Sequence, residues 1–382
     1  MEIQESPARS LHVGPLPVGC QQCIKGQKAV IFAGGSCTQP RDCHWYCPIS
    51  KERKDPTSFF INERLIHEDT DLIREIEAID AKGISFTGGD PLGYAFPQVI
   101  HWLKFLKQER GMRLHAHLYT NGINATLGKM EQLANAGLNE IRFHPPMHGL
   151  SRVKFAINRI PDVGMEIPAI PTRKYIKYMK KVVRFLEKIG ANFLNLNEFE
   201  FSVTNATALK ERGFQLKQGT MAAVDGSETA ALEILEWHNA RQNEHVSIHY
   251  CPIITKDEYQ LRNRYLRRAA NTRLPHESPT PEGTLLFGKH VSVTGHEMME
   301  LRQLLQRLSM DYPRTSVHHE GHGQDLIHQQ DELVVVFHKE FLQEKRLKLF
   351  AMKHGHGKRT GLVEAIPVEP RQECEFTPIT LL

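Results

Sequence analysis

Short apolar runs alternate with longer amphipathic stretches along the first 280 residues of the chain. Seven runs have the length and residue types of β-strands. They are Lys28–Phe32, Gly83–Phe86, Arg113–Leu118, Glu140–Phe143, Met165–Ala169, Phe193–Phe199 and Val246–His249. Apolar residues recur between them at helical spacing, at Val99, Trp102, Leu103 and Leu106 and at Ile176, Met179, Val183 and Leu186. This alternation predicts an α/β fold built as a parallel (β/α) barrel, partial or closed.

The pattern changes from about Pro281. Strand-like runs follow at Gly283–Phe287, Leu333–Phe337 and Leu362–Ile366, and an amphipathic helix is predicted around Leu301–Leu308. We therefore expect three parts: an N-terminal segment over residues 1–27, the barrel over residues 28–280, and a small C-terminal α+β domain over residues 281–382.

Length and composition fit a soluble enzyme, which we expect in the cytoplasm. The 382 residues are 40% hydrophobic and 24% charged, which is enough to bury a large core. The N-terminus lacks the apolar segment of a secretion signal, and no apolar run approaches the length of a membrane span. In the cytoplasm, clustered cysteines bind metals more often than they form disulfides. The net charge of +4 allows an anionic partner without requiring one.

Three cysteines lie on one predicted loop directly after the first strand. Cys37, Cys43 and Cys47 fall within the stretch Gly34–Ser50. A structural zinc ion usually takes four protein ligands, whereas a [4Fe–4S] cluster held by three cysteines leaves one iron open for chemistry. The loop therefore predicts an iron–sulfur cluster, which the aromatic pair Trp45-Tyr46 would shield from water.

A second motif, Thr87-Gly88-Gly89-Asp90-Pro91, follows the second predicted strand. Adjacent glycines at a strand end allow the backbone to approach a ligand closely. The neighbouring Asp90 offers an anchor for a positively charged group.

Other predicted strands also end in polar residues. Tyr119–Gly122, Arg142–His144, Asn197–Glu200 and His249–Cys251 all stand at such ends. Because the active sites of β/α barrels lie at the C-terminal ends of the strands, these residues predict one shared site.

The cysteine triad followed by the Gly-Gly-acid turn resembles the radical S-adenosylmethionine (SAM) superfamily. The stretches GCQQCIKG, GISFTGGDPLG, AGLNEIRFHP, NLNEFEFS and KDEYQLRNR resemble one prokaryotic group of that superfamily, described as related to the activating enzyme of pyruvate formate-lyase. The likeness covers most of residues 18–290. One feature departs from it: the usual triad is Cys-x3-Cys-x2-Cys, whereas the gaps here are five and three residues.

The resemblance implies a mechanism and a set of binding residues. Cys37, Cys43 and Cys47 would hold a [4Fe–4S] cluster that cleaves SAM, and the resulting 5′-deoxyadenosyl radical would take hydrogen from an unidentified substrate. A flavodoxin or ferredoxin would supply the electron. The residues implied at SAM or substrate are Gly88, Gly89, Asp90, Thr120, Asn121, Glu166, Asn197 and Glu198. Alternatively, Asn121 forms an ordinary turn and Glu166 a salt bridge at the rim.

The remaining cysteines suggest a second metal site. Cys20 and Cys23 have the Cys-x2-Cys spacing of a metal half-site, and Cys251 lies beside His249 at a strand end. We expect zinc or an auxiliary cluster there, with the alternative that Cys251 and Cys374 are small buried residues. The histidine-rich run His318–His322 is expected to be a solvated loop, because it lacks the spacing of a helical zinc motif.

Four functions remain open at this point. The first is direct modification of a small molecule, and the second is glycyl-radical activation of a partner protein. The third is RNA modification, for which the basic stretches Arg262–Arg268 and Lys353–Arg359 would bind phosphates, although a solvated helix face also explains the first stretch. The fourth is a non-catalytic binding module in which the cysteines hold zinc.

Overall fold

The computed structural model describes residues 2–39, 42–241, 245–292, 294–311, 318–319, 333–354 and 359–380. It divides into two compact units, Met1–Asn263 and Arg264–Leu382. The boundary lies before the expected position near residue 280, and the N-terminal segment belongs to the first unit.

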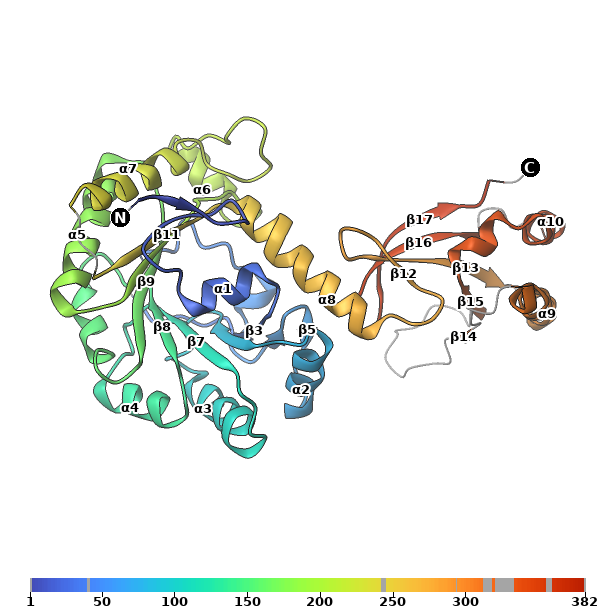
Figure 1. Ribbon diagram of the computed structural model, residues 1–382, viewed down its shortest axis with the longest axis horizontal. Helices are drawn as coiled ribbons and strands as arrows, with labels where there is room; N and C mark the ends of the chain where they lie inside the picture. Colours follow the sequence, from blue (N-terminus) through green and yellow to red (C-terminus); the bar gives the residue numbers. More distant parts are fainter. Residues whose placement is uncertain are drawn as a thin grey trace. The chain divides into compact units, whose positions relative to one another are not determined.

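Seven parallel strands form the centre of the first unit and confirm the seven predicted strands (Figure 1). Each pairs with the next along the chain, which is the arrangement of a β/α barrel. They are β3 (Lys28–Ala33), β6 (Gly83–Thr87), β7 (His115–Thr120), β8 (Glu140–Phe143), β9 (Asp162–Pro168), β10 (Phe193–Asn197) and β11 (Ser247–Cys251).

Short antiparallel strands extend this sheet at both edges, so the barrel is partial. β1 (Gln4–Glu5) and β2 (Leu11–Val13) continue from β11, while β4 (Phe59–Ile61) and β5 (Arg64–Leu65) continue from β3. Within the described ranges, no strand pairing joins β3 to β11. These edge strands protect the open sides of the sheet.

Helices cover the outer side of the sheet, as Figure 1 shows for α3, α4 and α5. The two predicted apolar stripes lie on α3 with the following helical turn η2, and on α5. Helix α5 begins after Thr172, whose hydroxyl accepts a hydrogen bond from the Tyr175 amide, and ends at Gly190 in the left-handed conformation. The helical segments of this unit are α1 (Val18–Ile24), η1 (Glu52–Lys54), α2 (Asp69–Ala78), α3 (Phe96–Lys104), η2 (Phe105–Glu109), α4 (Leu127–Asn135), η3 (Leu150–Phe155), α5 (Arg173–Ile189), α6 (Ala206–Glu211), α7 (Ser227–Ala240) and η4 (Thr255–Leu261).

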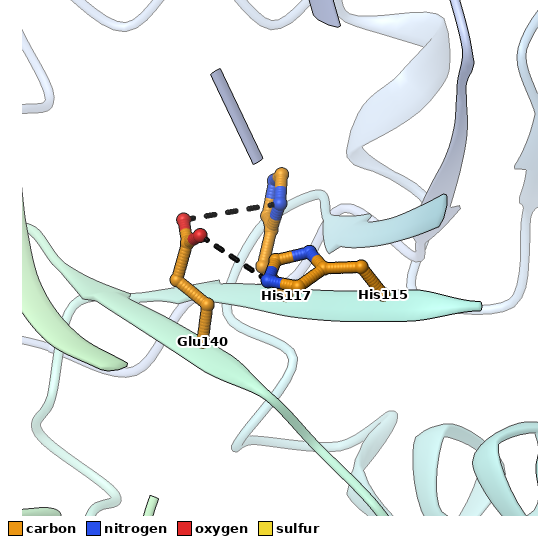
Figure 2. A group of neighbouring side chains, drawn as sticks. All are labelled: His115, His117 and Glu140. Atoms are coloured by element: carbon orange, nitrogen blue, oxygen red, sulfur yellow. Dashed lines mark ion pairs between the residues drawn. The ribbon is translucent and has the colours of Figure 1, made fainter. Parts of the chain in front are cut away.

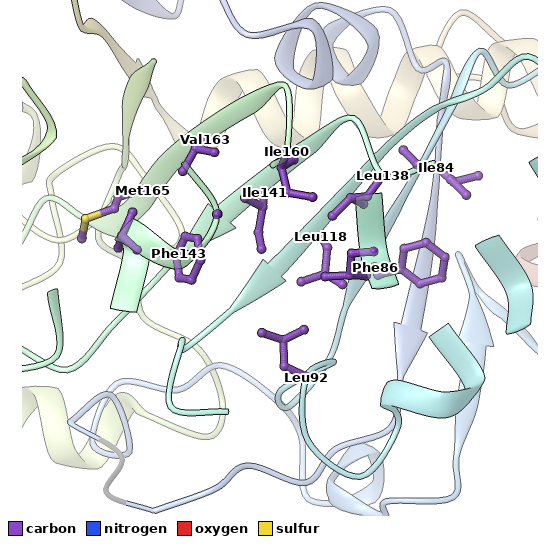
Figure 3. Close-up of a cluster of buried hydrophobic side chains, with 14 of the residues drawn as sticks. Ile84, Phe86, Leu92, Leu118, Leu138, Ile141, Phe143, Ile160, Val163 and Met165 are labelled. Atoms are coloured by element: carbon purple, nitrogen blue, oxygen red, sulfur yellow. The ribbon is translucent and has the colours of Figure 1, made fainter. Parts of the chain in front are cut away.

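The two faces of the parallel strands differ in chemistry. On β7, Ala116 and Leu118 pack in the outer core beneath the helices, whereas His115, His117 and Tyr119 face the barrel interior. The outer core is continuous from strand to strand (Figure 3). Its strand residues include Ile84, Phe86, Leu118, Ile141, Phe143, Val163 and Met165. Because side chains alternate along a strand, the residues between these form an interior that is largely polar.

Helix α1 closes the N-terminal end of this interior. The Gly19 amide donates a hydrogen bond to Glu140 Oε2 at 3.1 Å, and Glu140 is the first residue of β8. A Cβ atom at Gly19 would lie 2.6 Å from His117 Nδ1. Glycine is therefore what allows α1 to approach the strands so closely.

The second unit has the predicted α+β composition. Its antiparallel sheet has the order β14-β15-β13-β16-β17, with β12 paired to β13. Leu301, Leu305, Phe337 and Phe350 belong to its main apolar core. Its elements are α8 (Arg262–Thr272, which begins in the first unit), β12 (Ser278–Pro279), β13 (Leu285–Ser292), α9 (Gly295–Asp311), β14 (His318–His319), β15 (Leu333–Phe337), η5 (Lys339–Gln343), α10 (Lys345–Lys353), β16 (Thr360–Ile366) and β17 (Gln372–Pro378).

Two expectations for this region need correction. His318 and His319 form strand β14 against β15 rather than a loop, while residues 320–322 lie outside the described residues. Arg268 is buried rather than solvated, because its guanidinium donates to the Pro367 carbonyl oxygen at 2.5 Å. The four arginines of the basic stretch all have interaction partners, which weakens their case as a phosphate-binding surface. Residues 355–358 of the second basic loop are outside the described residues.

No helix among the described residues is long and apolar enough to cross a membrane.

Candidate functional site

The cysteine loop is held in place by its aromatic pair. Trp45 stacks on Phe214 with ring centroids 6.0 Å apart, and both rings pack against Phe199. The Tyr46 hydroxyl lies 2.8 Å from His144 Nε2, beyond the end of β8. These contacts fix the middle of the long loop, while its three cysteines remain only partly buried.

The Gly-Gly-Asp turn packs directly on the start of the cysteine loop. The Gly89 amide donates to the Gly34 carbonyl oxygen and the Asp90 amide to the Ser36 carbonyl oxygen, both at 2.8 Å. A Cβ atom at Gly89 would lie 2.1 Å from the Ser36 oxygen. The structure thus brings the two sequence motifs together, and the absence of a side chain at Gly89 permits it.

Asp90 organises the turns around it. Its buried carboxylate accepts hydrogen bonds from Thr120 Oγ1 at 2.6 Å and from Asn124 Nδ2 at 3.0 Å. Asn124 Nδ2 also donates to Thr38 Oγ1 in the cysteine loop. The Asn121 side-chain oxygen accepts the Ile123 amide, which is the contact of an ordinary turn. Asp90 therefore links the ends of β6 and β7 to the cysteine loop.

Glu166 and Asn197 meet inside the barrel. Asn197 Nδ2 donates to Glu166 Oε1 at 2.8 Å, and Arg142 and Asn195 donate to Glu166 Oε2 at 2.7 and 3.0 Å. Burial raises the pKa of Glu166, but the Arg142 charge and the two asparagine amides outweigh it and leave that pKa below its ordinary value. Glu166 is thus an ionised member of a salt bridge in the barrel interior.

Glu198 lies apart from this group. Its Oε2 accepts the Ile253 amide at 2.8 Å, so it positions the segment that follows β11.

A second polar cluster, which we did not predict, occupies the N-terminal end of the interior (Figure 2). His115 and His117 extend from β7 and Glu140 from β8. Within the described ranges these form the one set of three His, Cys, Asp or Glu ligand atoms that all lie within 4.8 Å of one another. Burial lowers the pKa of His115 to about 4 and also lowers that of His117. The sequence does contain a signal that could have predicted this cluster. Polar and apolar residues alternate in the stretches HAHLY and EIRF, which places His115, His117 and Glu140 on one face of the sheet.

Arg142 connects the two polar groups of the barrel interior. It donates from Nε to Glu140 Oε1 at 2.5 Å and from Nη1 to Glu166 at 2.7 Å. On the Glu140 side, Lys28 Nζ lies 3.1 Å from His115 Nδ1. Burial lowers the pKa of Lys28 to about 8.

Cys20 and Cys251, two of the cysteines expected at a second metal site, have different surroundings. Cys20 Sγ accepts hydrogen bonds from Arg142 Nη2 and Asn195 Nδ2 at 3.4 Å, within the interior network. Cys251 ends β11, and its Sγ accepts from Gln260 Nε2 at 3.7 Å. In the described part of the chain, Cys20, Cys23 and Cys251 do not form a three-ligand set within 4.8 Å. Both nitrogens of the buried His249 lack a hydrogen-bond partner.

Comparison with known proteins gives one close sequence relative. A Methanocaldococcus jannaschii protein named "Putative glycyl-radical enzyme activating enzyme" is 35% identical over 311 residues, a match spanning 78% of this chain and 79% of the relative. No family model matches the chain.

Among solved structures, Streptococcus suis SuiB bound to precursor peptide SuiA is similar with a TM-score of 0.41, at 13% identity over 58% of this chain and 48% of SuiB. Coproporphyrinogen III oxidase (HemN) from Escherichia coli, a radical SAM enzyme, gives 0.34, at 10% identity over 59% and 55% of the two chains. The present chain thus spans about half the length of each. These scores are too low to bear on function.

Proposed function

This chain belongs to the radical SAM superfamily of enzymes, in the group related to the activating enzyme of pyruvate formate-lyase, and we propose that Cys37, Cys43 and Cys47 hold its [4Fe–4S] cluster. The observation that carries this proposal is the pair of 2.8 Å hydrogen bonds that join the Gly88–Asp90 turn to the cysteine loop. They bring the proposed cluster ligands and the proposed SAM-binding turn to one end of the barrel.

The residues present fit the cluster. Three thiols on one loop supply three of the four cubane ligands and leave one iron for SAM. All three cysteines are partly buried, so they are accessible to a cluster while their loop is anchored by Trp45 and Tyr46. A cubane binds each thiolate at a different iron, so its cysteines need not converge on one point. The extra residues between the cysteines are held by contacts of their own. Asp42, for example, accepts a hydrogen bond from the Met147 amide at 3.0 Å.

The Gly-Gly-Asp turn would bind the methionyl end of SAM mainly through its backbone. The carboxylate of Asp90 is already engaged by Thr120 and Asn124. We assign Asp90 and Thr120 as positioning residues that hold the backbone of Gly88 and Gly89 toward SAM. Asn121 lies in the next turn, where its amide nitrogen would serve the ribose or carboxylate.

Deeper in the barrel, Glu166 and Asn197 would face the ribose or the substrate. The salt bridge to Arg142 keeps Glu166 ionised and fixes its orientation, so it would accept hydrogen bonds from hydroxyl or amino groups. Glu198 would act indirectly, by fixing the segment after β11. When bound, the cluster and SAM supply a 5′-deoxyadenosyl radical that takes a hydrogen atom from the substrate.

Anaerobic reconstitution with iron and sulfide tests this proposal. We expect about four irons per chain and release of 5′-deoxyadenosine and methionine from SAM under dithionite. A flavodoxin or ferredoxin would be the natural electron donor and should replace dithionite in the assay. Zinc that is lost when Cys37, Cys43 and Cys47 are replaced by alanine, with no SAM cleavage, would instead identify a zinc-stabilised binding module and refute the proposal.

The substrate has two candidate classes. The relative's name favours the α-carbon of a glycine in a partner protein as the hydrogen donor. The polar interior around Glu166 and Asn197 favours a small polar molecule. Extracts from cells grown on glycine deuterated at the α-carbon, separated by size, would distinguish them. Deuterium in 5′-deoxyadenosine from the protein fraction supports a glycyl-radical activase, and transfer from the small-molecule fraction alone opposes it.

A further inference from the structure

His115, His117 and Glu140 have the geometry of a metal site at the N-terminal end of the barrel. The two histidines are two residues apart on β7 and therefore share its inner face. Glu140 pairs with His117 in the strand register. Its Oε2 lies 3.5 Å from His115 Nε2 and its Oε1 4.0 Å from His117 Nδ1, as Figure 2 shows.

The histidine nitrogens that face Glu140 have no hydrogen-bond partner. His115 Nε2 and both nitrogens of His117 are buried and unsatisfied. Lys28 Nζ lies 3.1 Å from the other nitrogen of His115, Nδ1, and His115 Nε2 is directed at Glu140. Coordination through Nε2 leaves the ring proton on Nδ1, so the metal-bound state requires Lys28 as the neutral amine that accepts this proton in a hydrogen bond. Burying unsatisfied polar atoms is costly, and native structures contain few of them. A bound metal ion would satisfy two of these three nitrogens.

The lack of a side chain at Gly19 keeps this space free. A Cβ atom there would lie 2.5 Å from Arg142 Nη2, 2.6 Å from His117 Nδ1 and 2.9 Å from Glu140 Oε1, beside two of the three ligands. Any larger residue at this position of α1 would fill the site.

The surrounding charges are balanced before a metal enters. Without a metal, Lys28 and Arg142 carry positive charge, which Glu140 and Glu166 offset; when a metal binds, Lys28 gives up its proton and Arg142 remains the one of these two cations that opposes it. The Cys20 thiol also lies nearby, 3.4 Å from Arg142 Nη2, and Lys28 Nζ donates to Gln22 Oε1 at 3.0 Å. A dication must therefore be held by strong coordination bonds rather than by an excess of negative charge. Two imidazoles and one carboxylate provide such bonds for zinc.

We propose that His115, His117 and Glu140 bind one Zn²⁺ ion, with water in the fourth position. Arg142 and Lys28 act as the outer residues that orient Glu140 and His115. The site ties β7 to β8 beneath α1. It is separate from the cysteine triad, because His115 and Glu140 begin their strands whereas the cysteine loop follows the end of β3.

Metal analysis of the tag-free full chain tests the proposal. We expect about one zinc per chain, retained when Cys37, Cys43 and Cys47 are all replaced by alanine, because the triad is not part of the site. In that background, His117→Gln or Glu140→Gln should reduce zinc at least about tenfold. His249→Gln is the matched control: it removes a buried interior histidine with unsatisfied nitrogens outside the ligand set and should leave zinc unchanged.

Cobalt substitution of the triad-free chain gives a second readout that requires no change at the three proposed ligands. Visible bands of four-coordinate Co²⁺ with nitrogen and oxygen ligands are expected, without a thiolate charge-transfer band. Zinc that disappears together with the cysteine triad, zinc that persists in His117→Gln, or a thiolate band would each overturn the assignment.

Discussion

The two ends of the barrel interior carry different kinds of polar site. At the C-terminal end the polar groups stand on loops, and Cys37, Cys43 and Cys47 are only partly buried. At the N-terminal end they stand on strands beneath α1, where His117 and Glu140 are fully buried. Loops can vary in length while keeping a few anchors, whereas a strand position cannot shift by one residue without turning its side chain to the other face.

Because of this difference, we expect the two ends of the barrel to have different roles. The open end can admit a cofactor, a substrate and an electron donor. The closed end must balance its buried charges internally. It does so through a chain of contacts that runs from Lys28 to His115, Glu140, Arg142 and Glu166. Changes at the first end should therefore affect activity more than folding, and changes at the second should do the reverse.

The largest expected effect is on activity. Cys43→Ala should abolish 5′-deoxyadenosine formation, because two thiols cannot hold the cluster with one open iron. The barrel should remain folded, with an unchanged far-ultraviolet circular dichroism spectrum, since the loop lies outside the apolar core. Formation of 5′-deoxyadenosine at the wild-type rate would rule out Cys43 as a cluster ligand, and with it the assignment of the triad.

At the closed end, the main expected effect is on stability. Arg142→Met leaves Glu140 and Glu166 buried without their partner, which should lower the free energy of unfolding by about 3–5 kcal/mol in urea titrations. Lys82→Met, which removes the exposed pair with Asp80, should cost less than about 1 kcal/mol. If both substitutions lowered the free energy of unfolding equally, the predicted difference between buried and exposed ion pairs would be wrong.

Gly89→Ala probes the junction between the Gly-Gly-Asp turn and the cysteine loop. Its Cβ atom would clash with the Ser36 carbonyl oxygen, so the variant should lose about 1–3 kcal/mol of stability and take up less iron. Gly128→Ala is the control, since nothing lies within 4 Å of the new Cβ atom and alanine favours helix α4. Normal iron uptake in Gly89→Ala would show that the contact between the turn and the loop is dispensable.

Per pH unit, the smallest expected effect is the pH dependence of stability at the closed end of metal-free protein. The folded-state pKa of His115 is about 4 against an ordinary value of 6.5, so between these values the unfolded chain binds more protons. Stability is complete above about pH 6.5 and should fall by up to about 1.4 kcal/mol per pH unit toward pH 4. His117 contributes in the same direction. Urea titrations at several pH values would measure the slope, and His115→Gln should reduce it. If His115→Gln left the slope unchanged, His115 would not be the source of the pH dependence.

The sequence could predict a site at the open end because the candidate residues form compact motifs. Three cysteines on one loop and the Gly88-Gly89-Asp90 turn are recognisable without knowing what they contact. The seven strands were equally visible as apolar runs. The sequence also predicted that polar residues follow the strands, although it did not show that Asp90 would be engaged by Thr120 and Asn124.

The closed end was missed because its residues are scattered and each looks ordinary alone. His115, His117 and Glu140 alternate with apolar residues inside predicted strands, and we assigned them no role there. The role of Gly19 depends on where α1 docks, which no local pattern reveals. The short edge strands β2 and β4, of three residues each, are likewise too brief to leave a periodic signal.

Electron paramagnetic resonance of anaerobically reconstituted, dithionite-reduced protein, recorded with and without SAM, tests the central assignment most directly. We expect the signal of a reduced [4Fe–4S] cluster that changes when SAM is added, because SAM binds the iron left open by Cys37, Cys43 and Cys47. A cluster signal that is indifferent to SAM, or no cluster at all, would contradict the assignment of the cysteine loop as the radical SAM centre.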